Sequence, residues 1–428
     1  MLNNKICLVI AAAVAAVALT ACGGGGSNGT ASVRLVNSTS THPALTMLSS
    51  GTTVITATPI DTVSSYAGVS AGSPPLQVND AVTGTALATL APSVGAGAHY
   101  VLVAYESGGI VRSTIVNEDT AVPAVGTASL RVLDGATDAG AVDVYVTDPA
   151  VDIGVLASPS FTFPSSPSLQ TSAFVSLSPG TYRIRVTGAG NPADLRLDVP
   201  SFPLASQEVA AVLLTPTIGG TLVNGAVLAQ QAAYTAGRNT TARVRLAAAV
   251  SGNAIVSASA ANTPVAASVV SPSVSAYAVV PAGSALNVSV NGGSVAAPAA
   301  PLLAGSDSTL LVYGAPGTAT ASLIADDNHL PTLASNLKLR MINGLTGAAT
   351  PLTLNAGFAV LASNVAPGTA SSYSVVASST ALRIDVFSPL SPTAIYSDPA
   401  LSIPGNAVYT LFMLGDAGAP LHILRKDR

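Results

Sequence analysis

Four segments of the chain repeat one short pattern, an arginine set in an apolar run. The arginines are Arg34, Arg131, Arg245 and Arg340, and the steps between them are 97, 114 and 95 residues. Side chains alternate between the two faces of a strand, so an arginine with apolar neighbours predicts a strand whose other face is buried. Recurrence at this spacing predicts four copies of one structural unit, each the length of a small domain.

Two further markers follow each arginine in the same order. A short strand is expected to begin at an aromatic residue, which could plug the core or make a hydroxyl bond resembling a tyrosine corner. A wholly apolar run near the end of each copy predicts a central strand that is buried on both faces. The aromatic residues are Tyr66, Phe174, Tyr277 and Tyr373, and the apolar runs are residues 100–103, 209–214, 310–313 and 409–414.

Each copy has several short strand-like segments separated by Gly, Pro, Ser and Asn, and helical periodicity is scarce. This pattern predicts an all-β chain of tandem, immunoglobulin-like antiparallel β-sandwiches. Placed end to end, four such domains would extend on the order of 130 Å. The expected segments are a signal peptide at residues 1–21, a linker at 22–29, and copies 1 to 4 at 30–123, 126–231, 240–331 and 335–428.

The N-terminus has the features of a secretory signal. Lys5 provides a positive charge, an apolar run follows at residues 6–19, and small residues precede Cys22. Residues 19–22, Leu-Thr-Ala-Cys, resemble a bacterial lipobox. The resemblance implies cleavage before Cys22, lipidation of its thiol and acylation, for example by palmitate, of the new amino terminus. Two or three acyl chains anchor a protein stably. Gly23 stands where Asp would signal inner-membrane retention, which implies the outer membrane of a Gram-negative cell.

Cys22 is the only cysteine left after cleavage, because Cys7 lies inside the signal. No disulfide is therefore expected within the mature chain, and packing must supply its stability. Charged residues make up 8% of the chain and the net charge is −4, so no basic surface for nucleic acid is expected. The terminal Arg425, Lys426 and Arg428 are interpreted as a solvated tail.

Candidate chemistry is sparse, and each motif has a simpler structural interpretation. Residues 68–72, with Ser70 at the centre, match the G-x-S-x-G pattern of serine hydrolases but are expected to form a strand and a turn without a helix. No metal site is expected at the histidines, because they lack ligand spacing. The acidic cluster at Asp326, Asp327 and Asn328 is interpreted as a solvated loop. The histidines are His42, His99, His329 and His422.

The densest acidic run in the chain has no calcium-loop spacing, so its members are interpreted as structural. Asp143 is expected to point outward from a strand. Charged residues that alternate with apolar ones downstream are interpreted as a solvated sheet face: Arg183, Arg185, Arg196 and Asp198. The acidic run comprises Asp134, Asp138, Asp143, Asp148 and Asp152.

Residues 130–146, LRVLDGATDAGAVDVYV, resemble the opening motif of the domain of unknown function 4397, which commonly reads VRVVHASPDAPAVDVYV. Residues 141–146 match closely, and Arg131 and Asp138 also fit, whereas Asp134 replaces the usual His. The resemblance is specific in copy 2 and faint in the others. It implies a secreted or surface-anchored β-sandwich, often in tandem, with no established reaction.

These features favour a non-enzymatic lipoprotein of the cell envelope whose sandwiches act as a spacer, scaffold or adhesion module. The alternative is a module that binds glycan or another envelope polymer. We expect no catalytic residue, metal or cofactor. The expected partners are the membrane, through lipid on Cys22, and an envelope polymer or protein. The ligand-binding residues are left open.

Overall fold

The computed structural model describes residues 29–156, 158–347 and 350–428. Within these ranges the chain forms β-strands and three short 3-10 helices, and it has no α-helix. No helix in this part is long and apolar enough to cross a membrane. The signal segment and Cys22 lie outside the described residues. The 3-10 helices are η1 (Thr137–Ala139), η2 (Ile153–Val155) and η3 (Pro316–Thr318).

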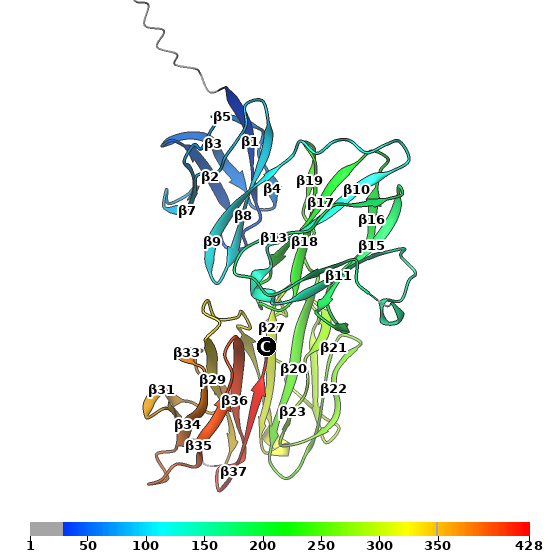
Figure 1. The fold of residues 1–428 in the computed structure, drawn as a ribbon. Coiled ribbons are helices and arrows are strands. Elements are labelled where there is room, and N and C mark those ends of the chain that lie inside the picture. Colours follow the sequence, from blue (N-terminus) through cyan, green and yellow to red (C-terminus); the bar gives the residue numbers. More distant parts are fainter. Residues whose placement is uncertain (1–28, 157, 348–349) are drawn as a thin grey trace, which may run out of the picture.

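Copy 1 consists of two sheets that pack face to face (Figure 1). One sheet has the order β4-β1-β8-β9, with β5 also paired to β1, and the other has the order β3-β2-β6-β7. The strands are β1 (Thr30–Asn37), β2 (Ala44–Ser49), β3 (Thr52–Pro59), β4 (Thr62–Val63), β5 (Ala67–Ser70), β6 (Leu76–Asp80), β7 (Ala86–Leu90), β8 (His99–Ser107) and β9 (Ile110–Asn117).

Copy 2 repeats this plan with the sheets β13-β10-β17-β18-β19 and β12-β11-β15-β16, and β14 also pairs with β10. The tandem β-sandwich predicted from the repeat is thereby confirmed. The strands are β10 (Ala128–Asp134), β11 (Val142–Thr147), β12 (Phe161–Phe163), β13 (Gln170–Thr171), β14 (Val175–Leu177), β15 (Gly180–Gly188), β16 (Asn191–Leu204), β17 (Val209–Pro216), β18 (Val223–Ala229) and β19 (Tyr234–Thr235).

Copy 3 has the sheets β23-β20-β27-β28 and β22-β21-β25-β26, with β24 paired to β20. Its first sheet is the counterpart of the β1 and β10 sheets. The strands are β20 (Thr241–Val250), β21 (Ile255–Ala260), β22 (Thr263–Val270), β23 (Ser273–Val274), β24 (Ala278–Pro281), β25 (Leu286–Val290), β26 (Gly293–Val295), β27 (Asp307–Gly314) and β28 (Thr320–Asp326).

Copy 4 has the sheets β32-β29-β36-β37 and β31-β30-β34-β35, with β33 paired to β29. The strands are β29 (Asn336–Thr346), β30 (Leu352–Ala356), β31 (Ala359–Val365), β32 (Thr369–Ala370), β33 (Ser374–Ala377), β34 (Ser379–Phe387), β35 (Tyr396–Ile403), β36 (Ala407–Asp416) and β37 (Ala419–Lys426).

The first strand of each copy occupies the middle of its sheet, where it pairs in parallel with the late apolar strand. The parallel pairs are β1 with β8, β10 with β17, β20 with β27, and β29 with β36. Each sandwich therefore contains one parallel pair of strands, which the prediction of antiparallel sandwiches did not include. In copy 1 the chain goes from β1 to the second sheet (β2, β3), returns to the first sheet in antiparallel pairing (β4, β5), completes the second sheet (β6, β7), and then adds β8 parallel to β1.

Alternation along the first strand directs its side chains into two different cores. Val33 and Leu35 enter the core of copy 1, whereas Val36 on the opposite face enters a second cluster shared with copy 2. In copy 2, Val132 of β10 enters the core of that copy, and Leu133 on the opposite face enters the shared cluster. Both faces of the strand are buried, which explains the nearly continuous apolar sequence around each arginine.

The copies pack in pairs, with the β1 sheet of copy 1 against the β10 sheet of copy 2, and the β20 sheet of copy 3 against the β29 sheet of copy 4 (Figure 1). The first interface includes Val103, Leu213 and Leu228. The second includes Leu311 and Phe412. The copies do not form the row about 130 Å long that end-to-end placement would give, because the outer faces of these sheets are apolar and bury each other.

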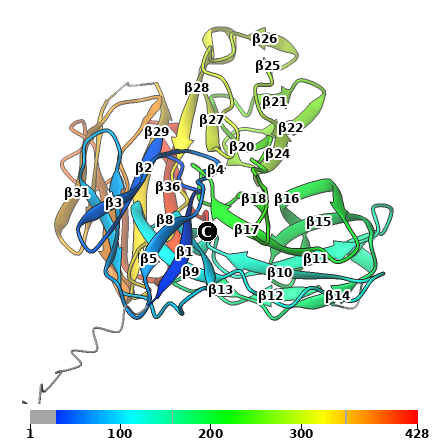
Figure 2. The same cartoon turned by 90° about the horizontal axis from the view of Figure 1, so that it is seen from above.

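The two pairs also contact each other, so the copies form a two-by-two arrangement (Figures 1 and 2). The loop after β17 joins copy 3 by backbone hydrogen bonds. The Gly219 amide donates to the Gly305 carbonyl at 2.9 Å, and the Asn328 amide donates to the Gly219 carbonyl at 2.9 Å. A Cβ at Gly220 would lie 2.3 Å from the His329 amide nitrogen, so only glycine permits this approach.

Candidate functional site

The repeated arginines and the repeated aromatic residues, which the sequence presents as separate markers, lie together in all four copies. The guanidinium carbon of Arg34 lies 5.3 Å from the ring centre of Tyr66. The other three pairs have distances of 4.5 to 4.6 Å. Each arginine therefore has a cation–π contact within its own copy. These three pairs are Arg131 with Phe174, Arg245 with Tyr277, and Arg340 with Tyr373.

In the interface between copies 3 and 4, the repeated arginine of each copy pairs with an aspartate of the other, in a buried and nearly symmetric network. Arg245 of copy 3 pairs with Asp427 of copy 4, and Arg340 of copy 4 pairs with Asp326 of copy 3. Each arginine also donates from Nε to a threonine of its own copy. These distances are 2.8 Å from Arg245 to Thr309 and 3.1 Å from Arg340 to Thr410. Both arginine side chains are 2% exposed, so the charges lie inside the interface.

Copies 1 and 2 have an unequal version of this network. Arg34 pairs with Glu118 of its own copy and donates from NH2 to the carbonyl of Ala229 in copy 2 at 3.0 Å. In copy 2, Gln230 stands at the position that Glu118 has in copy 1. Arg131 pairs with Ala211 and Ala211 with Leu228, and Gln230 follows Leu228 by two residues. Its amide joins copy 1 by hydrogen bonds to the backbone of Thr120, at 3.0 and 2.7 Å.

A second set of polar contacts joins all four copies where the pairs meet. The amide of Gly108 in copy 1 donates to both carboxylate oxygens of Asp138 in copy 2, at 2.8 and 3.0 Å. Burial raises the pKa of Asp138, while the charge of His329 and the Gly108 hydrogen bond oppose that rise. Asp138 belongs to the 130–146 motif and lies in η1, directly before β11.

His329 joins copy 3 to copy 2. Its Nδ1 lies 2.6 Å from Asp327 Oδ1, and its Nε2 lies 3.0 Å from the carbonyl oxygen of Thr217. A carbonyl can only accept, and the carboxylate is an acceptor as well, so both ring nitrogens carry protons. Burial opposes this charge, but the hydrogen bond and charge of Asp327, with the charge of Asp138, raise the pKa of His329.

Lys338 joins copy 4 to copy 3. Its ammonium group donates to the carbonyls of Asp327 and His329, at 2.9 and 3.1 Å, and to the Asp327 carboxylate at 2.5 Å. Burial lowers the pKa of Lys338, and Asp327 acts against that shift. The pKa of Asp327 is lowered, because hydrogen bonds from His329 and Lys338 outweigh the effect of burial. Asp138, His329 and Lys338 thus tie the four copies together.

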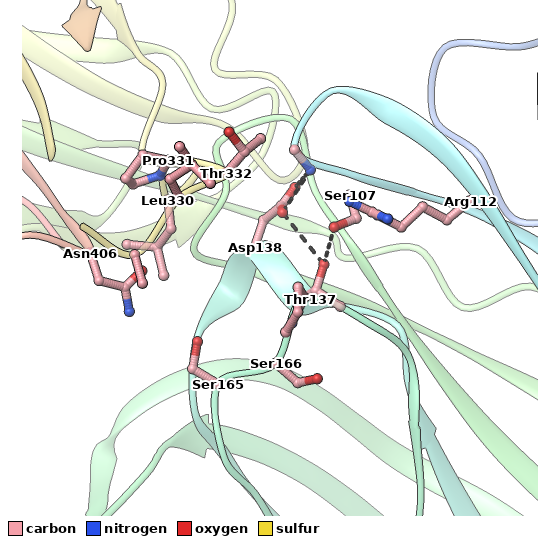
Figure 3. A pocket seen from close by; sticks show the side chains of 14 residues that line it. Ser107, Arg112, Thr137, Asp138, Ser165, Ser166, Leu330, Pro331, Thr332 and Asn406 are labelled. Carbon is pink, nitrogen blue, oxygen red and sulfur yellow. Dashed lines mark hydrogen bonds between the residues drawn. The ribbon is translucent and has the colours of Figure 1, made fainter. Parts of the chain in front are cut away.

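Two adjoining cavities open at this junction, with volumes of about 330 and 500 Å³. They share Gly108, Asp138, Leu330, Pro331 and Thr332. Figure 3 shows Asp138 and Thr137 between Ser107 on one side and the Leu330 to Thr332 segment on the other. Apolar walls with a few fixed charges suit the binding of a polar ligand. In the part of the chain that the structure describes, no group of three or more metal-ligating side chains is found.

Ser70, the centre of the G-x-S-x-G match, is exposed and ends β5. Among the described residues its hydroxyl has no hydrogen bond to an acid or a base, and the chain continues as a bend rather than a helix. The geometry of a nucleophile elbow is therefore missing at this position.

The four histidines lie apart, each with its own neighbour. His42 lies 3.2 Å from Glu106, and His99 lies 3.0 Å from Asp119. The His422 ring stacks on Tyr396 with 3.9 Å between the ring centres. His329 alone lines the junction cavities.

Several charged residues that were interpreted as solvated are buried. Asp143 accepts a hydrogen bond from the Gly190 amide at 2.8 Å instead of pointing into solvent. Asp326 lies in the interface between copies 3 and 4, where it pairs with Arg340. Asn328 is also buried and donates to Asp307 at 2.7 Å, whereas Asp327 of the same cluster is exposed. Arg185 and Arg196 are buried too, whereas Arg183 and Asp198 form a half-exposed ion pair.

The acidic run of copy 2 divides in the same way. Asp134 and Asp138 are buried, Asp152 caps η2 by accepting from the Gly154 amide at 2.8 Å, and Asp148 is exposed. The expected solvated tail is also wrong in part. Arg425 and Lys426 belong to β37, and Arg428 packs between the copies.

Sequence reasoning missed the junction, because its members come from four distant segments. One signal was available: Asp327, His329 and Lys338 flank Pro331, the expected joint between copies 3 and 4. Charged residues at a joint are well placed to connect domains, but their partners depend on how the copies pack.

A family model for a domain of unknown function, DUF4397, matches residues 31–145. This part of the chain is similar to the DUF4397 family. The DUF4397 match covers the strands of copy 1 and runs on through Tyr145, so it includes Asp138 and all but the last residue of the motif recognised in the sequence. The remainder of copy 2, and copies 3 and 4, lie beyond it.

No curated protein matches this chain. Among solved structures, a "putative cell adhesion protein" from Bacteroides uniformis is 13% identical, covers 47% of this chain and 98% of its own, and has a TM-score of 0.21. A second "putative cell adhesion protein", from Bacteroides ovatus, is 10% identical, covers 72% of this chain and 97% of its own, and has a TM-score of 0.14. Neither likeness is close enough to carry an argument.

Proposed function

We propose that this protein is a non-enzymatic, lipid-anchored component of the cell envelope that acts as a binding head in adhesion or scaffolding. The observation that carries the proposal is the set of contacts that joins the four copies around the two adjoining junction cavities, hereafter the cleft. A spacer gains reach by placing its domains in a row, whereas this chain gives up reach to bury the outer faces of its sheets.

The anchor rests on the lipobox at residues 19–22, and we propose the outer membrane of a Gram-negative cell as its location. Fractionation of cells that express the native chain and the Cys22→Ser variant tests this. The native chain is expected in the outer-membrane fraction, and the variant is expected to be released. A variant that remains in the membrane fraction would contradict the anchor.

The absence of catalysis is part of the proposal. Two observations support it: Ser70 ends an exposed strand, and both ring nitrogens of His329 are already hydrogen bonded. A histidine in that state cannot take a proton from a nucleophile. A hydrolase would instead be supported if a serine-reactive probe labelled Ser70.

Binding through the cleft can be tested with a bulky side chain at its rim. Ser165 is exposed and lines the cleft, whereas Ser168 is exposed in the same loop but lies outside it. Cells that display the Ser165→Trp variant are expected to attach less well to immobilised bacterial cells than cells that display the Ser168→Trp variant. Equal attachment of both variants and the native chain would favour a spacer.

The same cleft suits the alternative function, in which the ligand is a glycan or another envelope polymer. Its polar groups are set in apolar walls, the general form of a small-ligand site. A glycan array probed with the Cys22→Ser protein separates the two functions. Saturable binding that Ser165→Trp abolishes would favour the polymer-binding module.

A further inference from the structure

A third cavity adjoins the two at the junction and has a different chemistry. Its volume is about 420 Å³, and it shares Ser165, Leu330 and Asn406 with the smaller junction cavity. Three arginines line it: Arg196 of copy 2, Arg243 of copy 3 and Arg428 of copy 4. Cations from three separate domains therefore face one space.

Two of these arginines have acidic partners. Arg196 donates to Asp194 Oδ2 from Nε at 3.1 Å and from NH2 at 2.6 Å. Arg243 Nε lies 3.6 Å from Asp307 Oδ1, too long for a hydrogen bond. The guanidinium of Arg243 also lies 4.3 Å from the ring centre of Tyr277, which holds it in place.

Arg428 is the exception. Among the described residues its guanidinium has no hydrogen bond or ion pair, although its backbone is held by Val408, whose amide donates to the Arg428 oxygen at 3.2 Å. The side chain extends to copy 2, where a Cβ at Gly140 would lie 3.1 Å from Arg428 NH2. Burial, together with the charges of Arg196 and Arg243, lowers the pKa of Arg428 to about 9.

Charges on the walls do not compensate Arg428. Asp427 also lines the cavity, but it is paired with Arg245 in the interface between copies 3 and 4. Asp194 is held by Arg196, and Asp307 faces Arg243. The guanidinium of Arg428 thus has no paired carboxylate in this partly enclosed space. Its charge-assisted hydrogen bonds would stabilise an anion that entered the cavity.

We propose that this cavity, hereafter the arginine cavity, binds an anionic group, a carboxylate or a phosphate, with Arg428 as its principal ligand and Arg243 as a second. The planar guanidinium group presents paired donors that match both anions. The cavity opens beside the cleft of the proposed function, so an envelope polymer with acidic groups is the class of ligand that it would take. This inference rests on that function only for the identity of the polymer, since binding of the anion can be measured alone.

The test uses the full-length Cys22→Ser protein at low ionic strength, titrated calorimetrically with inorganic phosphate, with glucuronate and with neutral glucose. We expect saturable binding of at least one anion and none of glucose. Arg428→Gln is expected to weaken the anion at least tenfold. Lys426→Gln, which removes an exposed cation two residues earlier, is the matched control and is expected to leave binding unchanged.

A third variant guards against misfolding of Arg428→Gln. Ser165→Glu places a carboxylate at the rim of the arginine cavity and is expected to compete with the added anion while keeping all three arginines. Tighter binding of inorganic phosphate would favour a phosphate ligand, and tighter binding of glucuronate would favour a carboxylate ligand. Equal affinities in Arg428→Gln and Lys426→Gln, or unchanged affinity in Ser165→Glu, would overturn the proposal. Neither result would affect the attachment assay that tests the binding head.

Discussion

Arg245 of copy 3 and Asp427 of copy 4 form an ion pair inside the interface between these copies, 182 residues apart in the sequence. The arginine is 2% exposed and the aspartate is fully buried. Arg340 and Asp326 repeat the pair in the opposite direction. The interface is thus approximately two-fold symmetric, because equivalent residues of the two repeated copies make equivalent contacts in opposite directions.

Arg245→Ala is expected to lower the free energy of unfolding by about 3–5 kcal/mol, because it leaves buried carboxylates without a counter-charge. Arg183→Ala breaks the half-exposed pair with Asp198 and is expected to cost at most about 1 kcal/mol. Urea unfolding of both variants provides the measurement. Similar costs would show that the interface pair is no more important than a surface one.

The repeated tyrosines predict opposite results for one substitution. Tyr277 donates to Asp326 at 2.5 Å, whereas the buried hydroxyl of Tyr373 has no hydrogen-bond partner among the described residues. Tyr277→Phe is expected to destabilise the protein by about 1–3 kcal/mol, and Tyr373→Phe is expected to be neutral or slightly stabilising. Phe174 already provides the natural example in copy 2. Thermal unfolding of the two variants side by side tests this, and a larger loss for Tyr373→Phe would contradict it.

Asp134 makes stability depend on pH. Its carboxylate is buried, which raises its pKa to about 6, while the hydrogen bond from the Ala136 amide acts against the rise. Because the folded-state pKa exceeds the unfolded value near 3.9, its favourable contribution is complete below about pH 4 and is lost as the pH rises through about 6. Asn37 and Asn343 occupy the same place in copies 1 and 4, and each donates to two carbonyls.

Asp134→Asn is therefore expected to stabilise the protein by on the order of 2 kcal/mol at pH 8 and to have little effect at pH 3 to 4. The exposed Asp148→Asn is the control and is expected to change little at either pH. Unfolding curves across this pH range measure the difference. A loss of stability at pH 8 would mean that the charged carboxylate is preferred at this position.

The side-by-side packing of the copies predicts a compact particle in solution. A globule of this size has a radius of gyration near 21 Å, whereas a row of four domains about 130 Å long has one of about 38 Å. We expect small-angle scattering of the Cys22→Ser protein to give less than about 30 Å. Phe412→Asp, which puts a charge into the interface between copies 3 and 4, is expected to increase the value. A native value near 38 Å would contradict the two-by-two arrangement.

Much of each sandwich could be predicted from local pattern. The strand around Arg131 and the strand that follows Phe174 were both expected, because alternation and turn residues act over a few positions. The burial of the charged residues could not be predicted in this way. Asp143 and Arg185 alternate with apolar neighbours as solvated residues do, yet both are buried. A pattern shows which side chains share a face and does not show what covers it.

The sequence by itself determined the fourfold repeat, the β-sandwich class and the apolar strand at the centre of each copy, because these depend on periodicity and on turns within short stretches. Only the tertiary structure decided that the arginines face a neighbouring copy, that Asp138, His329 and Lys338 meet, and that Arg428 reaches Gly140. Those contacts join residues from different domains, and they arise only once the outer faces of the sheets have been buried against each other.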